Sequence, residues 1–481
     1  MTTTEHAAST VASPGASADP GDDDVTATVA AFAAELRYED VAAPVLHRIK
    51  LHLLDAIGCA VAGSDLDISR SARAVASRMG SGGASRVFGT QERFTPIAAA
   101  FANSVIANAL DYDDGFEVNG KGMGHPSASL VPAALAALGR RPVCGRAFLV
   151  ALAAAYEINN RLILAMQPSA ARFRQVYGIG QHQAIGAALV FARLSGCDVA
   201  GIRNAIGLAG ALTPLPSLHK YNWQSRPIIS LKDGVAPAAQ AGVQAAIMSE
   251  EGFVGSADLL DGPQGYWRMI GSDRFDASLV VDGLGTLWLA GKGSFKTYPA
   301  CRWLAPALEA FENAYVKARL TPAAIAQVRV ATFGIIADKL MERRPLNPID
   351  AQFSLPHLIG AIATGRPSGP SWFSAGAFAD EALREVADKV EVCVDPAMDR
   401  LMNGRMRRPS AAVEVVTTDG RRFASEVVAP LGGERRPVDD GVVLDKAARN
   451  LGGRGDAAGL IAAILAIENC DDVAGLFDEC F

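Results

Sequence analysis

The sequence predicts a mainly α protein with an α+β part, built as a large all-helical domain and a smaller α+β lid domain. Three observations support this prediction. The chain is 50% hydrophobic but only 7% aromatic, so its apolar content is aliphatic and alanine-rich, which suits closely packed helices. Apolar residues recur at helical spacing up to about residue 251. Strand-like alternation is confined to a later stretch, between residues 328 and 430, which helical segments precede and follow.

The helical domain is expected to begin at residue 25, after a disordered tail rich in Ala, Ser, Gly, Pro and Asp. Its first clear helix covers 45–63, where apolar residues recur every four positions and Gly63 provides a typical stop. Further helices are expected at 95–110, 127–139, 146–166, 183–195, 199–211 and 236–251. Glu157 and Arg161 interrupt the most apolar stretch, so no window offers the roughly 20 apolar residues that span a bilayer. We therefore expect no membrane partner.

The pattern changes near residue 292, where a cationic loop leads into a helix at 304–317. Alternating apolar residues then predict strands at 328–333, 390–395, 411–420 and 421–430, the last two joined by a hairpin at Asp419-Gly420. Helical spacing returns from 444 to 481. The chain is therefore expected to have four parts: a disordered tail at 1–24, the helical domain at 25–291, the lid domain at 292–430 and a helical return to the first domain at 431–481.

Composition and motifs exclude several classes of protein. A formal charge of −6 leaves no basic stripe to neutralise phosphates, so no nucleic-acid partner is expected. The seven cysteines form no CxxC pair, and no GxxxxGK[ST], GxSxG or strand-borne GxGxxG motif occurs. The N-terminus lacks the basic and apolar regions of a secretory signal, and unpaired cysteines suit a reduced compartment, so we expect a cytoplasmic protein.

The most unusual segment is an acidic cluster that a glycine-rich loop connects to a histidine. Asp111, Asp113 and Asp114 lie together at the end of an apolar helix, and His125 follows the loop. Three carboxylates this close repel one another, so at least one should have a raised pKa unless cations or hydrogen bonds intervene. A histidine returning beside them could move a proton near neutral pH. Alternatively, the acids form a turn and His125 caps the next helix, and the pattern leaves both interpretations open.

Two further segments carry cations. Lys232 stands just before a helix of small residues, where it could hold a carboxylate, although a solvated lysine is the simpler interpretation. Lys296, Tyr298 and Arg302 lie at the start of the lid, from which they could close over an anionic substrate or form an ordinary basic hinge. Cys301, in the same loop, has no histidine nearby in the sequence and is expected to be a buried structural thiol.

His182 is the other candidate among the histidines, because it precedes a small-residue helix. It either lines a cleft or is a structural histidine whose hydrogen bonds are satisfied within the core. No HxxxH or HExxH pair occurs, and the cysteine spacing matches no zinc or iron–sulfur pattern. We therefore expect no metal site.

Seven segments, in this order, resemble the MmgE/PrpD family, which contains 2-methylcitrate dehydratase, cis-aconitate decarboxylase and iminodisuccinate epimerase. They are LHLLDAIGCAVAG (51–63), NALDYDDG with HPSAS (108–129), AYEINNRL (155–162), QHQAIGAALVFARLSG (181–196), the segment from SLKDG to GFVG (230–255), FKTYPACRW (295–303) and DAQFSLPHLIGAIATG (350–365). The similarity fades beyond about residue 400. The resemblance implies a helical domain, an α+β lid, a homodimer, and an active site between the domains that needs no cofactor.

The resemblance also implies roles for individual residues. Asp111 and His125 match the family's catalytic Asp and His, and Lys296 matches the lysine of the lid hinge. Lys232 lies at, or one position from, an active-site lysine. The residues expected to bind substrate are Asp114, Tyr177, His182, Tyr298, Cys301 and Arg302.

The family's shared chemistry, proton transfer next to a carboxylate, suits these residue types. Lys232 and Lys296 would stabilise the negative charge that develops, and His125, oriented by Asp111 or sharing its proton, would move the proton. Gly115 and Cys301 stand where the decarboxylase branch has Thr and His, and Tyr177 where many members have His. These departures favour a hydro-lyase similar to 2-methylcitrate dehydratase, acting on a small di- or tricarboxylic acid. A cis-aconitate-type decarboxylase or an epimerase is the alternative.

Two readings from other classes remain open. Asp111-Tyr112-Asp113-Asp114 has the DxDD spacing of terpene cyclases that protonate an alkene, although such sites need aromatic faces and this chain has few. A non-enzymatic helical binding protein would instead show an apolar or charged surface stripe without converging ionisable loops.

Overall fold

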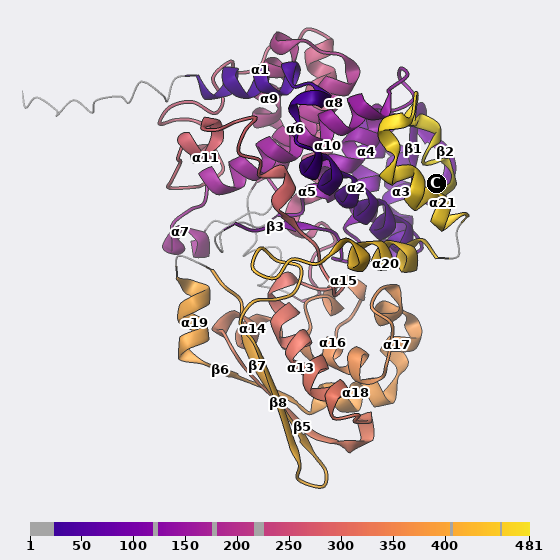
Figure 1. Ribbon diagram of the computed structural model, residues 1–481, viewed down its shortest axis with the longest axis vertical. Helices are drawn as coiled ribbons and strands as arrows, with labels where there is room; N and C mark the ends of the chain where they lie inside the picture. The colour runs from indigo at the N-terminus through magenta and orange to yellow at the C-terminus, as the bar shows by residue number, and fades with distance from the viewer. Residues whose placement is uncertain (1–23, 119–123, 176–179, 216–225, 405–406, 453–454) are drawn as a thin grey trace, which may run out of the picture.

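A computed structural model describes residues 24–118, 124–175, 180–215, 226–404, 407–452 and 455–481 (Figure 1). Helices fill the upper part of the view, and a small sheet with its own helices forms the lower part. Two hydrophobic clusters follow this division. The larger is built from residues before 291 and after 446, and the smaller is built mainly from residues 298–427. The predicted fold class, mainly α with an α+β part, is confirmed.

The upper part is a bundle of helices. Of the α-helices described there, seven were expected, with bounds within a few residues of those predicted, and five were not. Its helices are α1 (Val25–Glu35), α2 (Ala43–Gly63), α3 (Asp67–Gly80), α4 (Pro96–Ala107), α5 (Pro126–Ala137), α6 (Gly145–Ala165), α7 (Ala170–Gln175), α8 (Gln183–Ser195), α9 (Val199–Leu212), α10 (Val235–Glu250), α11 (Tyr266–Met269) and α12 (Ser278–Val281). Small residues allow close approach: a Cβ on Gly242 of α10 would lie 2.5 Å from the Ala184 carbonyl of α8. The alanine and glycine content that predicted helices therefore also sets how tightly they pack.

Helix α6 lies in the middle of this bundle. It is long and apolar enough to cross a membrane by length and composition, but 89% of its most apolar window is buried inside the protein, as in the core helices of globular proteins. Glu157 and Arg161 form a buried ion pair at 2.6 Å, and Arg161 also donates to the carbonyls of Val280 and Leu287. The charged residues that interrupt the apolar run thus bind the segment that contains Val280 and Leu287.

The lower part contains a four-stranded sheet in the order β6-β5-β7-β8. Strand β5 (Ile325–Thr332) pairs in parallel with β6 (Val390–Val394) and antiparallel with β7 (Ala411–Thr417), which forms the expected hairpin with β8 (Arg422–Val427). Alternate residues of β7 are buried because one face of the sheet packs against helices. The helices of this part are α13 (Ala305–Lys317), α14 (Gly334–Lys339), α15 (Pro348–Ala351), α16 (Leu355–Ala363), α17 (Ala375–Ala379), α18 (Glu381–Asp388) and α19 (Pro396–Asn403).

One hairpin was not expected from the sequence. Strands β1 (Ser81–Val87) and β2 (Thr90–Phe94) pair between α3 and α4. β1 contains two glycines and β2 is largely polar, so neither shows the apolar alternation that predicts a strand.

The two parts meet at a short ladder and at the C-terminal helices. Strand β3 (Gly115–Phe116) follows the acidic cluster and pairs with β4 (Gly293–Ser294), which begins the hinge into the lower part. After the lower part, α20 (Asp440–Leu451) and α21 (Ala457–Leu465) return to pack against α2 (Figure 1). These connections bring residues near 111, 296 and 446 to one place.

Candidate active site

Charged side chains from both parts of the protein form one buried cluster near their junction. Its centre is the contact between Asp111 and Lys296. Asp111 follows α4 with φ +50°, a conformation that side chains other than glycine rarely adopt. The Lys296 ammonium donates to Asp111 Oδ1 at 2.6 Å and to the Asp111 carbonyl at 2.8 Å. Because β3 and β4 pair next to these residues, the hinge loop lies against the acidic loop. Both side chains are buried, with 1% and 5% exposed.

A second ammonium, from Lys232, reaches the same carboxylate. Lys232 lies in a short 3₁₀ turn before α10; its Nζ is 3.3 Å from Asp111 Oδ1 and donates to Asn108 Oδ1 at 2.8 Å. Asp233 follows with φ +63°, and its Oδ2 lies 3.3 Å from the same ammonium. Lys232 is 3% exposed, so the solvated lysine considered from the sequence is ruled out.

His125 completes the cluster, although its closest carboxylate is not the one expected. Its Nδ1 lies 2.9 Å from Asp113 Oδ2, whereas its Nε2 lies 3.8 Å from Asp111 and 3.6 Å from Asp233. An ionised carboxylate only accepts, so Nδ1 carries the proton and Nε2 faces the two remaining acids. Asn108 Nδ2 donates to the other oxygen of Asp113 at 3.0 Å. Asp113, rather than Asp111, therefore orients the imidazole.

Cations do lie among the acids, which is the condition under which a raised pKa was not expected. Burial alone would raise the pKa of Asp111 and of Asp113, but the facing cations outweigh it, so both have a lowered pKa. The groups that lower the pKa most are the two lysines for Asp111 and His125 for Asp113. Burial would likewise lower the pKa of Lys232, yet the neighbouring carboxylates raise it. The cluster thus consists of charged groups held together by their opposite signs.

Asp114 has a different set of partners. It is fully buried, and it accepts from the Ser127 backbone N–H at 2.9 Å and from the Tyr156 hydroxyl at 3.1 Å. His52 Nδ1 lies 2.8 Å from its Oδ2, and the His52 ring stacks on Phe295 with centroids 4.5 Å apart. Asp114 therefore binds the N-terminus of α5, which begins directly after His125. It does not face the cluster, although it was expected to bind substrate.

Two of the other hinge residues expected to bind substrate already have side-chain partners. Arg302 donates to Glu117 Oε2 at 3.0 Å, and the Tyr298 hydroxyl donates to Glu312 on α13. Cys301 lies near Asp111, and burial raises its pKa to about 12, with Asp111 adding to the effect. The thiol is therefore protonated at neutral pH and is no nucleophile.

His182 lies against the residue that precedes His125. A Cβ built on Gly124 would be 3.6 Å from His182 Nε2, a nitrogen with no hydrogen-bond partner in the described part of the chain. Burial lowers the pKa of His182 to about 3, so the ring is neutral and its Nε2 can serve a bound ligand. Tyr177, the remaining residue expected to bind substrate, falls outside the described residues.

Asp111, His125 and Asp233 offer three potential metal-ligand atoms within 4.8 Å of one another. The charge that a cation would supply there is already provided by Lys232, which contacts both carboxylates, and by Lys296. This donor set therefore suits ammonium groups better than a divalent ion.

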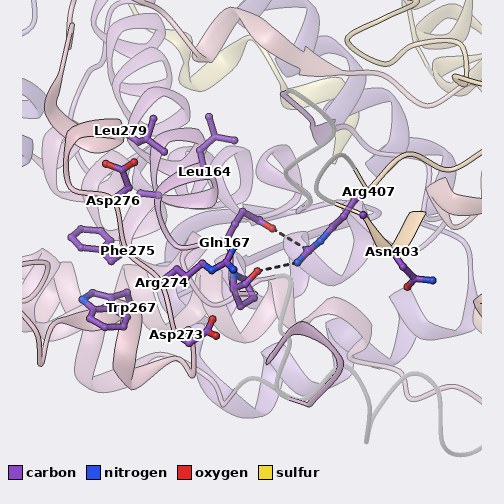
Figure 2. A pocket seen from close by; sticks show the side chains of 13 residues that line it. Leu164, Gln167, Trp267, Asp273, Arg274, Phe275, Asp276, Leu279, Asn403 and Arg407 are labelled. Atoms are coloured by element: carbon purple, nitrogen blue, oxygen red, sulfur yellow. Dashed lines mark hydrogen bonds between the residues drawn. The ribbon is translucent and has the colours of Figure 1, made fainter. Parts of the chain in front are cut away.

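One hollow near the junction of the two parts is lined by none of these charged residues. It has a volume of about 910 Å³ and lies between the end of α6, the segment 267–279 and the loop after α19, where Arg407 donates to Gln167 and to the Pro168 carbonyl (Figure 2). Beside Asn108 and Lys232 there is a cavity of about 10 Å³, room for about one water molecule.

Several members of the site were missed in the sequence. Asp233 directly follows Lys232, and Asn108 lies three positions before Asp111, but neither had a motif of its own. Lys446 and His52 reach the acidic loop from distant helices. The one available signal was Asp233-Gly234, which is typical of a tight turn that would aim a carboxylate at its neighbours.

Comparisons with known proteins extend over most of the chain. The model of the MmgE/PrpD N-terminal domain matches residues 27–277 and that of the C-terminal domain matches 298–470, so the similarity continues well past residue 400, contrary to expectation. A cis-aconitate decarboxylase of Aspergillus terreus is 23% identical over 442 residues, 88% of each chain. The cis-aconitate decarboxylase-like protein oryM of Aspergillus oryzae is 28% identical over 49% of each chain, and the cis-aconitate decarboxylase of Homo sapiens is 24% identical over 55% of this chain and 54% of its own.

Proposed function

This chain belongs to the MmgE/PrpD family, and on that premise we propose that it is a lyase acting on a small di- or tricarboxylic acid by proton transfer next to a carboxylate. One observation carries the proposal: two ammonium groups from distant segments lie within 3.3 Å of Asp111 Oδ1, beside the free nitrogen of an oriented imidazole. Such a site can bind a carboxylate and move a proton without a cofactor.

In the proposed reaction, a substrate carboxylate takes the place of Asp111 at Lys232 and Lys296. Removal of the proton on the adjacent carbon places negative charge on that carboxylate, and the two ammonium groups stabilise it as it develops. His125 Nε2 accepts the proton, because Asp113 keeps the proton of the ring on Nδ1 and would stabilise the imidazolium.

We propose dehydration as the overall outcome. The electron pair of the broken C–H bond forms the double bond, and the hydroxyl on the next carbon leaves as water after it receives the proton that His125 removed. Asp233 is within 3.6 Å of His125 Nε2 and is the group best placed to exchange protons with it during this second transfer.

Decarboxylation is the second candidate, because the relatives named above are cis-aconitate decarboxylases. The same charges serve this reaction differently: the C–C bond to a carboxylate breaks, carbon dioxide leaves, and the protonated His125 delivers its proton to the carbon that keeps the electron pair. The departures from the decarboxylase branch at Gly115 and Cys301 favour dehydration over it.

A terpene-cyclase reaction fits the site less well. That chemistry needs a neutral aspartic acid that donates its proton to an alkene, but the lowered pKa of Asp113 keeps this carboxyl ionised. Two buried lysines would also repel a carbocation.

The proposal is tested by incubating the protein with citrate, 2-methylcitrate, cis-aconitate and related acids in deuterated water and following the products by NMR. Dehydration gives an alkene with the carbon count unchanged, decarboxylation gives carbon dioxide and a shorter acid, and epimerisation gives deuterium at the stereocentre alone. His125→Gln should lower turnover about 10²–10⁴-fold, whereas His47→Gln, at a half-exposed histidine in the first turns of α2, should not. An inert wild-type protein, or full activity in His125→Gln, would refute the proposal.

A further inference from the structure

We propose that Lys446 of α20 is a positioning residue for the cluster, and that it acts through the backbone of Tyr112 on the two acids that flank it. The inference rests on the proposed function, because it assigns Lys446 a part in holding that site. Lys446 is 334 positions from Tyr112 in the sequence and does not touch any of the groups that would meet substrate.

The contacts of Lys446 converge on the acidic loop. Its ammonium donates to the Tyr112 carbonyl at 2.6 Å and lies 3.9 Å from the centre of the Tyr112 ring. Asp55 of α2 pairs with the same ammonium at 2.7 Å. The side chain is 3% exposed, so no water replaces these partners.

Tyr112 in turn joins the acidic loop to the hinge. Its hydroxyl donates to the carbonyl of Thr297, the residue directly after Lys296. Its backbone lies between Asp111, held at φ +50°, and Asp113, which orients His125. A loop in this conformation keeps its shape only where its surroundings fix it. Lys446 supplies a charge-assisted hydrogen bond to the backbone of the residue that lies between the two acids and also contacts the hinge.

Packing alone gives no reason for a lysine at this position. Burying a lysine and an aspartate costs more than burying apolar side chains of similar size, unless their contacts are excellent. Here the ammonium makes a backbone contact that an apolar residue could not make. Burial would lower the pKa of Lys446, but Asp55 raises it, so the side chain stays charged.

The test separates positioning from stability with three variants. Lys446→Met removes the hydrogen bond to the Tyr112 carbonyl and leaves Asp55 buried without its partner, so it loses both activity and thermal stability. Asp55→Asn combined with Lys446→Met removes both charges, and it should recover most of the melting temperature. Arg449→Met changes an exposed cation on the same helix and serves as the control.

In both variants that lack Lys446, kcat should fall about 100-fold, the effect of a misplacement near 1 Å, while KM changes little. Recovery of kcat together with the melting temperature in the double variant would show that Lys446 is only structural. A second readout needs no substrate: the downfield NMR signal of the proton between His125 and Asp113, assigned by its loss in His125→Gln. It should weaken or shift in the double variant and stay in Arg449→Met. An unchanged signal would overturn the inference even if the protein proves inactive on every acid.

Discussion

Lys296 Nζ lies 2.6 Å from Asp111 Oδ1, and this contact ties the hinge of the lower part to the acidic loop of the helical part. Both residues are buried, and the same carboxylate also faces Lys232 at 3.3 Å. Asp111 thus occupies the place that we assign to a substrate carboxylate.

If Lys296 stabilises the charge that develops on the substrate, Lys296→Met should lower kcat/KM about 10²–10³-fold, the usual cost of losing one such donor. Lys292→Met is the matched control, since Lys292 lies four positions earlier and is exposed. Steady-state kinetics of both variants on the acid that the wild type converts would check this. Equal losses in the two variants would assign the effect to the hinge as a whole.

The lowered pKa values of Asp111 and Asp113 predict how stability depends on pH. A carboxyl whose folded pKa is depressed stabilises the native state above its unfolded pKa of about 4, and this contribution disappears as the pH falls through the folded pKa. The free energy of unfolding of the wild type should therefore decline below about pH 4. The difference between wild type and Asp113→Asn should be largest at pH 6–7 and shrink toward pH 3. Urea unfolding at several pH values measures both, and a constant difference would contradict this account.

Binding of a polycarboxylate should be accompanied by proton uptake. Among the described groups of the cluster, the carboxylates of Asp111, Asp113 and Asp233 already outnumber the ammonium groups of Lys232 and Lys296, so an added anion increases the excess of negative charge in a buried site. That charge favours the protonated forms of the acids. Calorimetric titration with propane-1,2,3-tricarboxylate in phosphate and in Tris should give different apparent enthalpies. Identical enthalpies in the two buffers would show that no proton is taken up.

Gly293 should be intolerant of even one methyl group. A Cβ there would lie 2.3 Å from two atoms of the His52 ring, which stacks on Phe295 next to Lys296. Gly293→Ala should therefore lower the free energy of unfolding by about 1–3 kcal/mol through overpacking. Gly291→Ala, whose new Cβ would meet Val45 at an ordinary 3.6 Å, should change it by less than about 0.5 kcal/mol. Denaturant unfolding of both variants decides this, and equal effects would mean that His52 can move freely.

Much of the fold followed from local patterns. Helices such as α8 and α10 and the β7–β8 hairpin were expected, because their apolar spacing and turn residues are local patterns within short stretches of the sequence. The β1–β2 hairpin was missed, since two glycines and a polar strand give no such pattern.

The site was predictable only in part. Asp111, His125, Lys232 and Lys296 could be chosen because charged residues at breaks between apolar helices are conspicuous, and the structure brings all four together. Their pairings could not be predicted, because contacts such as Asp113 with His125, Asp114 with His52 and Lys446 with Tyr112 depend on how distant helices pack. Asp114 was assigned to substrate for the same reason: its buried partners belong to other helices.

The most direct test of the central claim is a crystal structure of the protein with propane-1,2,3-tricarboxylate, an acid that lacks a hydroxyl to eliminate. We predict that one of its carboxylates lies within hydrogen-bonding distance of both Lys232 Nζ and Lys296 Nζ, with its adjacent carbon facing His125 Nε2 and with Asp111 displaced from Lys296. An acid bound only in the hollow beside Arg407, with the Asp111–Lys296 contact intact, would contradict the account.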